Sequence, residues 1–99
     1  MYDRVMREMR RAARAGRLRL TDHAADEIEA EGFTFDDVVN CILTGEVVKV
    51  QFDADRRENK YVWYGEAADE REMGLVAKFD HHQRTVVITV FWLTIEDYD

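Results

Sequence analysis

The stretch that decides the fold is residues 84–93, which read RTVVITVFWL. It is rich in β-branched and aromatic residues, as is typical of a strand. Because successive side chains of a strand point to opposite faces of a sheet, one set should face a layer of helices and the other should face outward. The expected helix-facing residues are Val86, Ile88, Val90 and Trp92, and the outward set includes Thr85, Val87 and Thr89. Ile88 and Trp92 should therefore be almost completely buried.

Segments 47–52, 60–66 and 73–80 show a similar alternation, and short polar segments connect them. Short connections join antiparallel neighbours, because a parallel return needs a crossover of about a dozen residues or more. The pattern predicts a four-stranded antiparallel meander that ends with residues 84–94. In its first strand, the expected helix-facing residues are Val48, Val50 and Phe52.

The sheet face away from the helices, which we call the open face, should carry all three lysines of the chain. These are Lys49, Lys60 and Lys78, and Tyr64 is expected on the same face. Lysine and tyrosine side chains beside threonine hydroxyls suit contact with the phosphates of RNA. The plainer interpretation is a solvated outer face, where lysine is common.

Three helices are expected before the strands. The first ends before Gly16 and has an apolar stripe opposite a face of arginines. Thr21 and Gly32 bound the second helix, and Thr34 and Gly45 bound the third. All three should pack on one face of the sheet, which defines an α+β fold.

The length of 99 residues suits a single domain with one hydrophobic core. Within it, an Arg-rich amphipathic helix over residues 1–17 would precede a helix and sheet core over residues 18–94. The chain has one cysteine, Cys41, which excludes an intrachain disulfide and is expected to be an inert, buried side chain. No early apolar run resembles a signal peptide or a membrane span. We therefore expect a cytoplasmic protein without a membrane partner.

The net charge of −7 argues against generic binding to nucleic acid, which requires Lys or Arg. The charge is unevenly distributed, however. Residues 1–20 contain seven arginines and carry a charge of +5, which leaves −12 for residues 21–99. The arginine face of the first helix is either solvated or an arm that contacts phosphates or a partner. A solvated face is the simpler interpretation, because any surface helix has a charged side.

The three histidines do not suggest a metal site. His81 and His82 belong to an expected hairpin turn, and His23 lies at the start of the second helix. No set of Cys and His residues has the spacing of a zinc site, so we expect no metal and no cofactor. By itself, His23 would be a surface or capping side chain.

Several short motifs together resemble those of an uncharacterised family of small prokaryotic proteins that look like ribonuclease toxins. The motifs are Thr21-Asp22-His23-Ala24, Gly32, Thr44-Gly45-Glu46-Val47, Lys60-Tyr61-Val62 with Gly65, and Val87-Ile88-Thr89-Val90. The resemblance covers about residues 18–93 and implies the RelE-like and barnase-like fold, with RNA on the open face. It also implies a small antitoxin-like protein as partner, and it assigns the family's catalytic His and Thr to His23 and Thr89.

The chain departs from the family pattern at three positions. Glu27 stands where the family usually has Arg, Gly74 where it has His, and Phe91 where it has Tyr. Metal-free RNA cleavage needs a base, an acid and a cation, and the chain retains His23 and the lysines for these roles. The leading hypothesis is a toxin-like, RNA-interacting protein that acts as a metal-independent endoribonuclease. The alternative is a noncatalytic protein-interaction module, which a neutral or apolar open face would favour.

Overall fold

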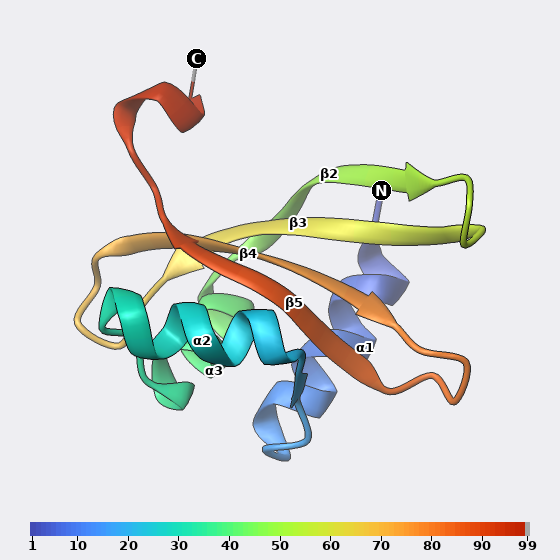
Figure 1. The fold of residues 1–99 in the computed structure, drawn as a ribbon, viewed down its shortest axis with the longest axis horizontal. Coiled ribbons are helices and arrows are strands. Elements are labelled where there is room, and N and C mark those ends of the chain that lie inside the picture. Colours follow the sequence, from blue (N-terminus) through green and yellow to red (C-terminus); the bar gives the residue numbers. More distant parts are fainter. Residues whose placement is uncertain (99) are drawn as a thin grey trace.

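The computed structural model describes residues 1–98, in which helices precede most of the strands (Figure 1). The elements are α1 (Asp3–Arg14), β1 (Arg19–Leu20), α2 (Asp22–Glu31), α3 (Phe35–Thr44), β2 (Glu46–Asp53), β3 (Glu58–Glu66), β4 (Glu72–Phe79), β5 (Thr85–Trp92) and the 3-10 helix η1 (Ile95–Tyr98). The α+β class and the three N-terminal helices agree with the sequence. Within residues 1–98, no helix is both long and apolar enough to cross a membrane.

The predicted four-stranded antiparallel meander is wrong. The sheet has five strands in the order β1-β5-β4-β3-β2, and β1 runs parallel to β5. Strands β2 to β5 do form successive antiparallel pairs. The extra strand contains only Arg19 and Leu20, which pair with Val86 and Val87. Two residues show no alternation, so β1 has no signal in the sequence.

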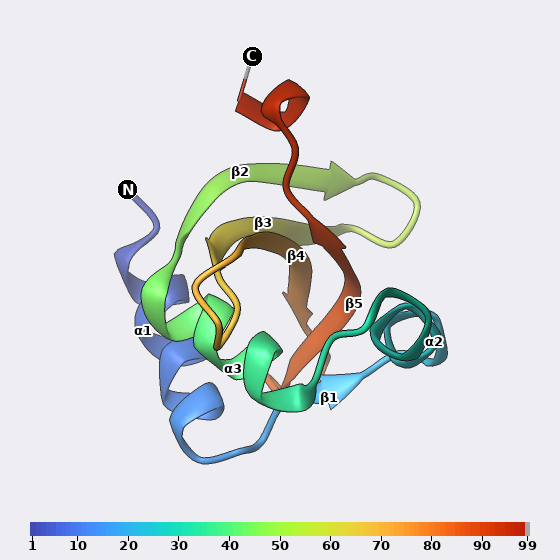
Figure 2. The same ribbon diagram turned by 90° about the vertical axis from the view of Figure 1, so that its left-hand side faces the viewer.

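The helices occupy two positions around the curved sheet. Helix α1 packs on α3, and α3 packs on β3, whereas α2 lies along β5. Figure 2 shows α2 on the far side of β5 from the α1–α3 pair. Helix α2 still contributes to the common core through Ala24 and Ile28.

The predicted helix boundaries are confirmed at their caps. The Thr21 hydroxyl accepts a hydrogen bond from the Ala24 N–H, and Gly32 ends α2 in the left-handed conformation with φ of 77°. The Thr34 hydroxyl accepts the Asp37 N–H, and the Asp37 carboxylate accepts the Thr34 N–H. This reciprocal pair is a capping box, which satisfies two backbone donors at the start of α3.

A bulge in β5 changes which residues reach the core. Val87 pairs with Ala77 and Thr89 pairs with Val76, so Ile88 is the extra residue between two paired neighbours. An extra residue shifts the alternation of side chains by one position. Consequently Thr85 and Val87 are buried in the first half of β5.

The prediction of which strand side chains point toward the helices is therefore wrong at several positions. Ile88 and Trp92 are partly exposed rather than fully buried. In β2, a second irregularity lies between Val47 and Lys49, so Val47 is buried while Val48 is exposed. Phe52, which was expected to face the helices, is 65% exposed. The fully buried large side chains are Met9, Val38, Cys41, Ile42, Trp63, Met73, Leu75, Val87 and Val90.

Candidate functional site

A cluster of polar side chains joins α2 to β5 around the carboxylate of Glu27. The Thr89 hydroxyl donates a hydrogen bond to Glu27 Oε1 at 2.5 Å, and the Val90 N–H donates to the same oxygen at 3.2 Å. His23 Nε2 lies 3.3 Å from this oxygen. One carboxylate oxygen therefore holds together the two residues that the family resemblance marked as catalytic, His23 and Thr89. We call His23, Glu27 and Thr89 the Glu27 cluster.

The start of α2 is fixed to β5 by Thr21. Its hydroxyl donates to the Ile88 carbonyl at 3.0 Å while it caps the helix, and its N–H donates to the Val87 carbonyl at 3.0 Å. His23 and Glu27 are four residues apart and so share one side of the helix. The bulge at Ile88 then brings Thr89 within reach of Glu27.

The Glu27 cluster combines a held carboxylate with an accessible imidazole. The Glu27 side chain is 27% exposed and the His23 side chain is 69% exposed. A carboxylate next to a histidine orients the imidazole and stabilises the imidazolium that forms when the histidine takes up a proton. The arrangement thus suits proton transfer to or from a molecule that approaches His23 from solvent.

Two of the three predicted phosphate-binding lysines are paired with carboxylates. Lys60 Nζ lies 3.3 Å from Asp53 Oδ2, and Lys78 Nζ lies 2.9 Å from Glu58 Oε1. The Arg56 N–H and then Lys60 lower the pKa of Asp53, so this carboxyl group is charged at neutral pH. These ion pairs balance much of the positive charge expected on the open face.

Lys49 and Tyr64 line a shallow hollow of about 470 Å³ on the open face. The remaining lining residues are Val48, Gln51, Val62, Val76, Phe91 and Asp97. The Tyr64 hydroxyl donates to the Asp97 carbonyl at 3.3 Å, which fixes the tyrosine beside η1. The hollow is adjacent to the Glu27 cluster, because Val76 pairs with Thr89 across β4 and β5. The structure therefore brings Lys49 and Tyr64 together in the lining of this hollow, which does not include the ion-paired Lys60 and Lys78.

Two of the departures from the family pattern are neighbours in space. Gly74 pairs with Phe91, and a Cβ atom at Gly74 would lie 2.6 Å from the Phe91 ring. The aromatic ring thus needs a residue without a side chain opposite it. The third departure, Glu27, is the centre of the cluster, where it contributes a negative charge in place of a positive one.

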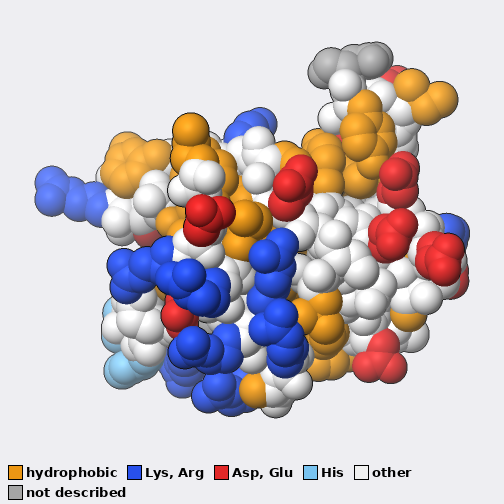
Figure 3. Space-filling model, turned by 180° about the vertical axis from the view of Figure 1, so that it is seen from behind, with side chains coloured by type: hydrophobic (Ala, Val, Ile, Leu, Met, Phe, Trp, Pro, Cys, Tyr) orange, Lys and Arg blue, Asp and Glu red, His pale blue; other side chains and the backbone are white. Residues whose placement is uncertain are grey.

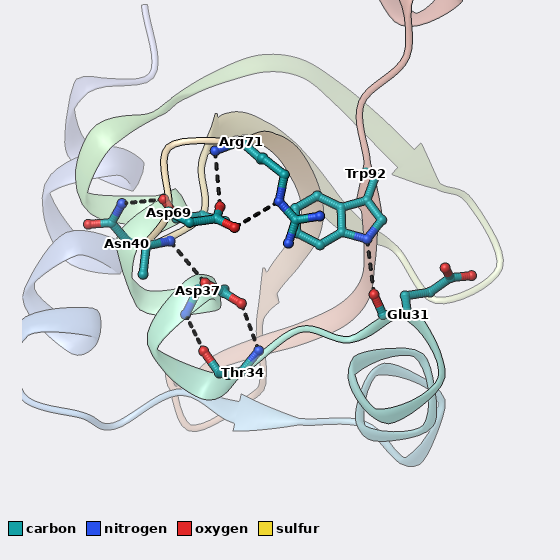
Figure 4. A network of polar contacts seen from close by, with 9 residues as sticks. Glu31, Thr34, Asp37, Asn40, Asp69, Arg71 and Trp92 are labelled. Carbon is teal, nitrogen blue, oxygen red and sulfur yellow. Dashed lines mark hydrogen bonds and ion pairs between the residues drawn. The ribbon is translucent and has the colours of Figure 1, made fainter.

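Sequence reasoning missed a second polar network, which ties the 67–71 loop to α3 (Figure 4). Besides its role in the capping box, Asp37 accepts the Ala68 N–H at 2.9 Å. Asn40 donates to the carbonyls of Glu66 and Ala67 at 3.0 and 3.1 Å. This network orders the connection between β3 and β4, and its partners lie too far apart in the sequence to be predicted from local spacing.

The same loop places a guanidinium on an aromatic stack. The Arg71 guanidinium lies 3.9 Å from the centre of the Trp92 ring, and Trp92 stacks on Phe33 with ring centres 4.0 Å apart. The Trp92 indole N–H also donates to the Glu31 carbonyl at 3.1 Å. These contacts cover part of the Trp92 ring, which packs against the core and remains partly exposed.

The single cysteine and the absence of a metal-ligand cluster bear on the chemistry open to residues 1–98. Cys41 is buried, as expected, and burial raises the pKa of its thiol to about 12. Among residues 1–98, no three His, Cys, Asp or Glu side chains are grouped so that they could hold a metal ion.

These features define an α+β domain with a histidine–carboxylate–threonine cluster between its second helix and its last strand. The chain belongs to the family described as a domain of unknown function (DUF4258), whose model matches residues 20–92. The expected membership in an uncharacterised family is thus confirmed, and the match leaves α1 outside. No curated protein matched the chain. No solved structure matched it either.

Proposed function

We propose that the chain is an RNA-interacting protein of the ribonuclease-toxin type, in which His23 transfers protons during metal-independent cleavage. The observation that carries the proposal is the Glu27 cluster. Its carboxylate lies 3.3 Å from the exposed imidazole and accepts hydrogen bonds from Thr89 and Val90. Exposed histidines without such a partner are ordinary surface residues, whereas a held carboxylate prepares His23 for acid–base chemistry.

The proposed reaction uses the 2′-hydroxyl of RNA as its nucleophile. Neutral His23 takes the hydroxyl proton while the oxygen attacks phosphorus, and Glu27 stabilises the resulting imidazolium. The imidazolium then gives its proton to the departing 5′-oxygen. The bond from phosphorus to that oxygen breaks, which leaves a 2′,3′-cyclic phosphate and a free 5′-hydroxyl. Thr89 acts as a positioning residue, because its hydroxyl holds Glu27.

The test is cleavage of labelled RNA by purified protein with a chelator present. Replacing His23 with Ala should slow cleavage about 100-fold and leave binding nearly unchanged, because the lost interaction is made in the transition state. His81→Ala is the matched control, since His81 is exposed in the β4–β5 turn and contacts neither Glu27 nor Thr89. Equal cleavage by the wild type and His23→Ala would show that His23 is not catalytic and that the activity came from a contaminant.

A specific observation favours a second candidate, a noncatalytic module that binds a small antitoxin-like protein. The open face carries two neutralised lysines, and the nearby Val48 and Phe52 side chains are 44% and 65% exposed. Exposed apolar side chains next to a shallow hollow suit a protein partner. If the wild type fails to bind RNA even at low salt, the ribonuclease proposal is rejected and this module remains.

A further inference from the structure

A groove of about 560 Å³ runs between α1, residues 17–19 and the β4–β5 turn. It differs from the open face in its charge. Four arginines line it, Arg11, Arg17, Arg19 and Arg84, together with the single carboxylate of Glu8. Figure 3 shows the corresponding gathering of Lys and Arg side chains on the back of the molecule, with histidine at its border. We call this feature the arginine groove.

Two of the four guanidinium groups are not balanced by a carboxylate. Arg11 lies 3.8 Å from Glu8, and Arg84 Nε lies 2.8 Å from Asp80. Arg17 and Arg19 form no ion pair with any carboxylate within residues 1–98. An uncompensated positive groove in a chain of net charge −7 is where an anion should gather.

The backbone around the arginine groove is held by the fold. Gly16 adopts a left-handed conformation with φ of 68°, and the Arg17 N–H donates to the Ala12 carbonyl at 2.9 Å. Leu18 is only 8% exposed and anchors the segment in the core between the two arginines. Arg19 belongs to β1 and pairs with Val86 of β5. Arginines on an anchored segment lose less conformational freedom when they bind a ligand.

We propose that the arginine groove binds the phosphodiester backbone of RNA. The inference rests on the proposed RNA interaction, and it moves the phosphate contacts from the ion-paired lysines to Arg17 and Arg19. A guanidinium matches two phosphate oxygens with two parallel N–H donors, which a lysine does not do. The exposed ring of His82 also lines the groove and offers a stacking surface for a base, which favours RNA over an acidic peptide.

Three of the four arginines of the arginine groove lie outside the family match. Arg11, Arg17 and Arg19 all precede Leu20, where that match begins. Residues 19–23 nevertheless connect the groove to the Glu27 cluster through β1 and the start of α2. The groove would therefore supply sequence-independent affinity, while the cluster acts on the bound strand.

The binding test uses a fluorescent 2′-O-methyl RNA oligonucleotide, which lacks the 2′-hydroxyl and cannot be cleaved by the proposed reaction. Anisotropy titrations over a range of salt concentrations compare the wild type with Arg17→Gln/Arg19→Gln. The matched control is Arg56→Gln/Arg57→Gln, which removes the same charge from the exposed β2–β3 turn. The groove variant should bind about tenfold more weakly. The slope of the logarithm of its binding constant against the logarithm of the salt concentration should fall in magnitude by about 1.4, since each phosphate contact to a single strand contributes about 0.7.

The outcomes distinguish failure of the arginine groove as the binding site from failure of the proposed RNA interaction. If the wild type binds RNA and both double variants weaken binding equally, the arginine groove is not the site, although the RNA interaction stands. If the wild type does not bind at low salt, both proposals fail. A glutamate-rich peptide that binds the groove more tightly than the RNA would overturn the choice of RNA as occupant. Arg17→Lys/Arg19→Lys, which keeps the charge, should restore only part of the affinity and shows whether the segment still folds.

Discussion

Gly45 at the end of α3 and Gly65 in β3 touch through their backbones. A Cβ atom added at Gly45 would lie 2.8 Å from the Gly65 Cα atom and 2.6 Å from the Cys41 carbonyl oxygen. A Cβ atom at Gly65 would overlap that same carbonyl oxygen. These atoms belong to the backbone of two packed elements, so a side chain at either position has to push α3 away from β3.

We therefore expect Gly65→Ala to lower the free energy of unfolding by about 3 kcal/mol, the upper end of the usual range for overpacking. Chemical denaturation measures this difference. Gly32→Ala is the control, because that position faces open space and its left-handed conformation costs about 1–2 kcal/mol. A Gly65→Ala protein as stable as the control would contradict the close approach of α3 and β3.

The hydrogen bond between Thr89 and Glu27 should be measurable as a coupling energy. In a double-mutant cycle of Thr89→Val and Glu27→Ala, the interaction should contribute about 1–2 kcal/mol to stability, since hydrogen bonds to charged groups exceed neutral ones. Thermal or chemical unfolding of the four proteins gives the value. Pairing Thr89→Val with Glu29→Ala, an exposed carboxylate of the same helix, should give additive effects.

The thiol of Cys41 should be unreactive in the native protein. Burial raises its pKa to about 12, and the reactive species is the thiolate. A thiol reagent such as Ellman's reagent should therefore label the native protein slowly at pH 8 and label the denatured protein at the rate of a free cysteine. Equal rates in the two states would mean that Cys41 of α3 is not buried against β4.

Asp80 should make the free energy of unfolding depend on pH in the acidic range. Desolvation acts to raise its pKa, but hydrogen bonds from Arg84 and from the His82 N–H outweigh it and lower the pKa from 3.8 to about 2. The stabilisation is therefore complete above pH 4 and disappears as the pH falls toward 2. Unfolding of the wild type and Asp80→Asn between pH 7 and pH 2 should show a difference in stability that shrinks over this interval. A difference in stability that stays constant over this interval would contradict the lowered pKa of Asp80.

Features set by neighbouring residues were predictable from the sequence. The caps at Thr21 and Thr34, the stop at Gly32 and the bounds of the four long strands all depend on local spacing. Strand β1 could not be predicted, because two residues are too few to show an alternation of apolar and polar side chains. The bulge at Ile88 was equally hidden, since it accompanies contacts with Thr21 and Glu27 that lie far away in the chain.

The candidate site was predictable only in part. His23 and Thr89 followed from the family resemblance, and their catalytic role stays a prediction. The four-residue spacing of His23 and Glu27 is a signal that could have suggested their contact. The ion pairs of Lys60 and Lys78 depend on the register of β3 with its neighbours, which no local pattern specifies. The position of Arg17 and Arg19 at a groove likewise depends on β1.

The pairing of β1 with β5 determines when the Glu27 cluster can form during synthesis. Thr21 and Ile88 are 67 residues apart, so β5 must be translated before α2 can pack against it. Contacts between such distant residues form late, because closing the loop between them costs entropy. A nascent chain stalled before residue 85 should therefore carry α3 and the early hairpins but leave His23 without Glu27 held beside it. The Glu27 cluster would thus assemble only after β5 has left the ribosome, which hydrogen exchange on chains stalled before and after that point can establish.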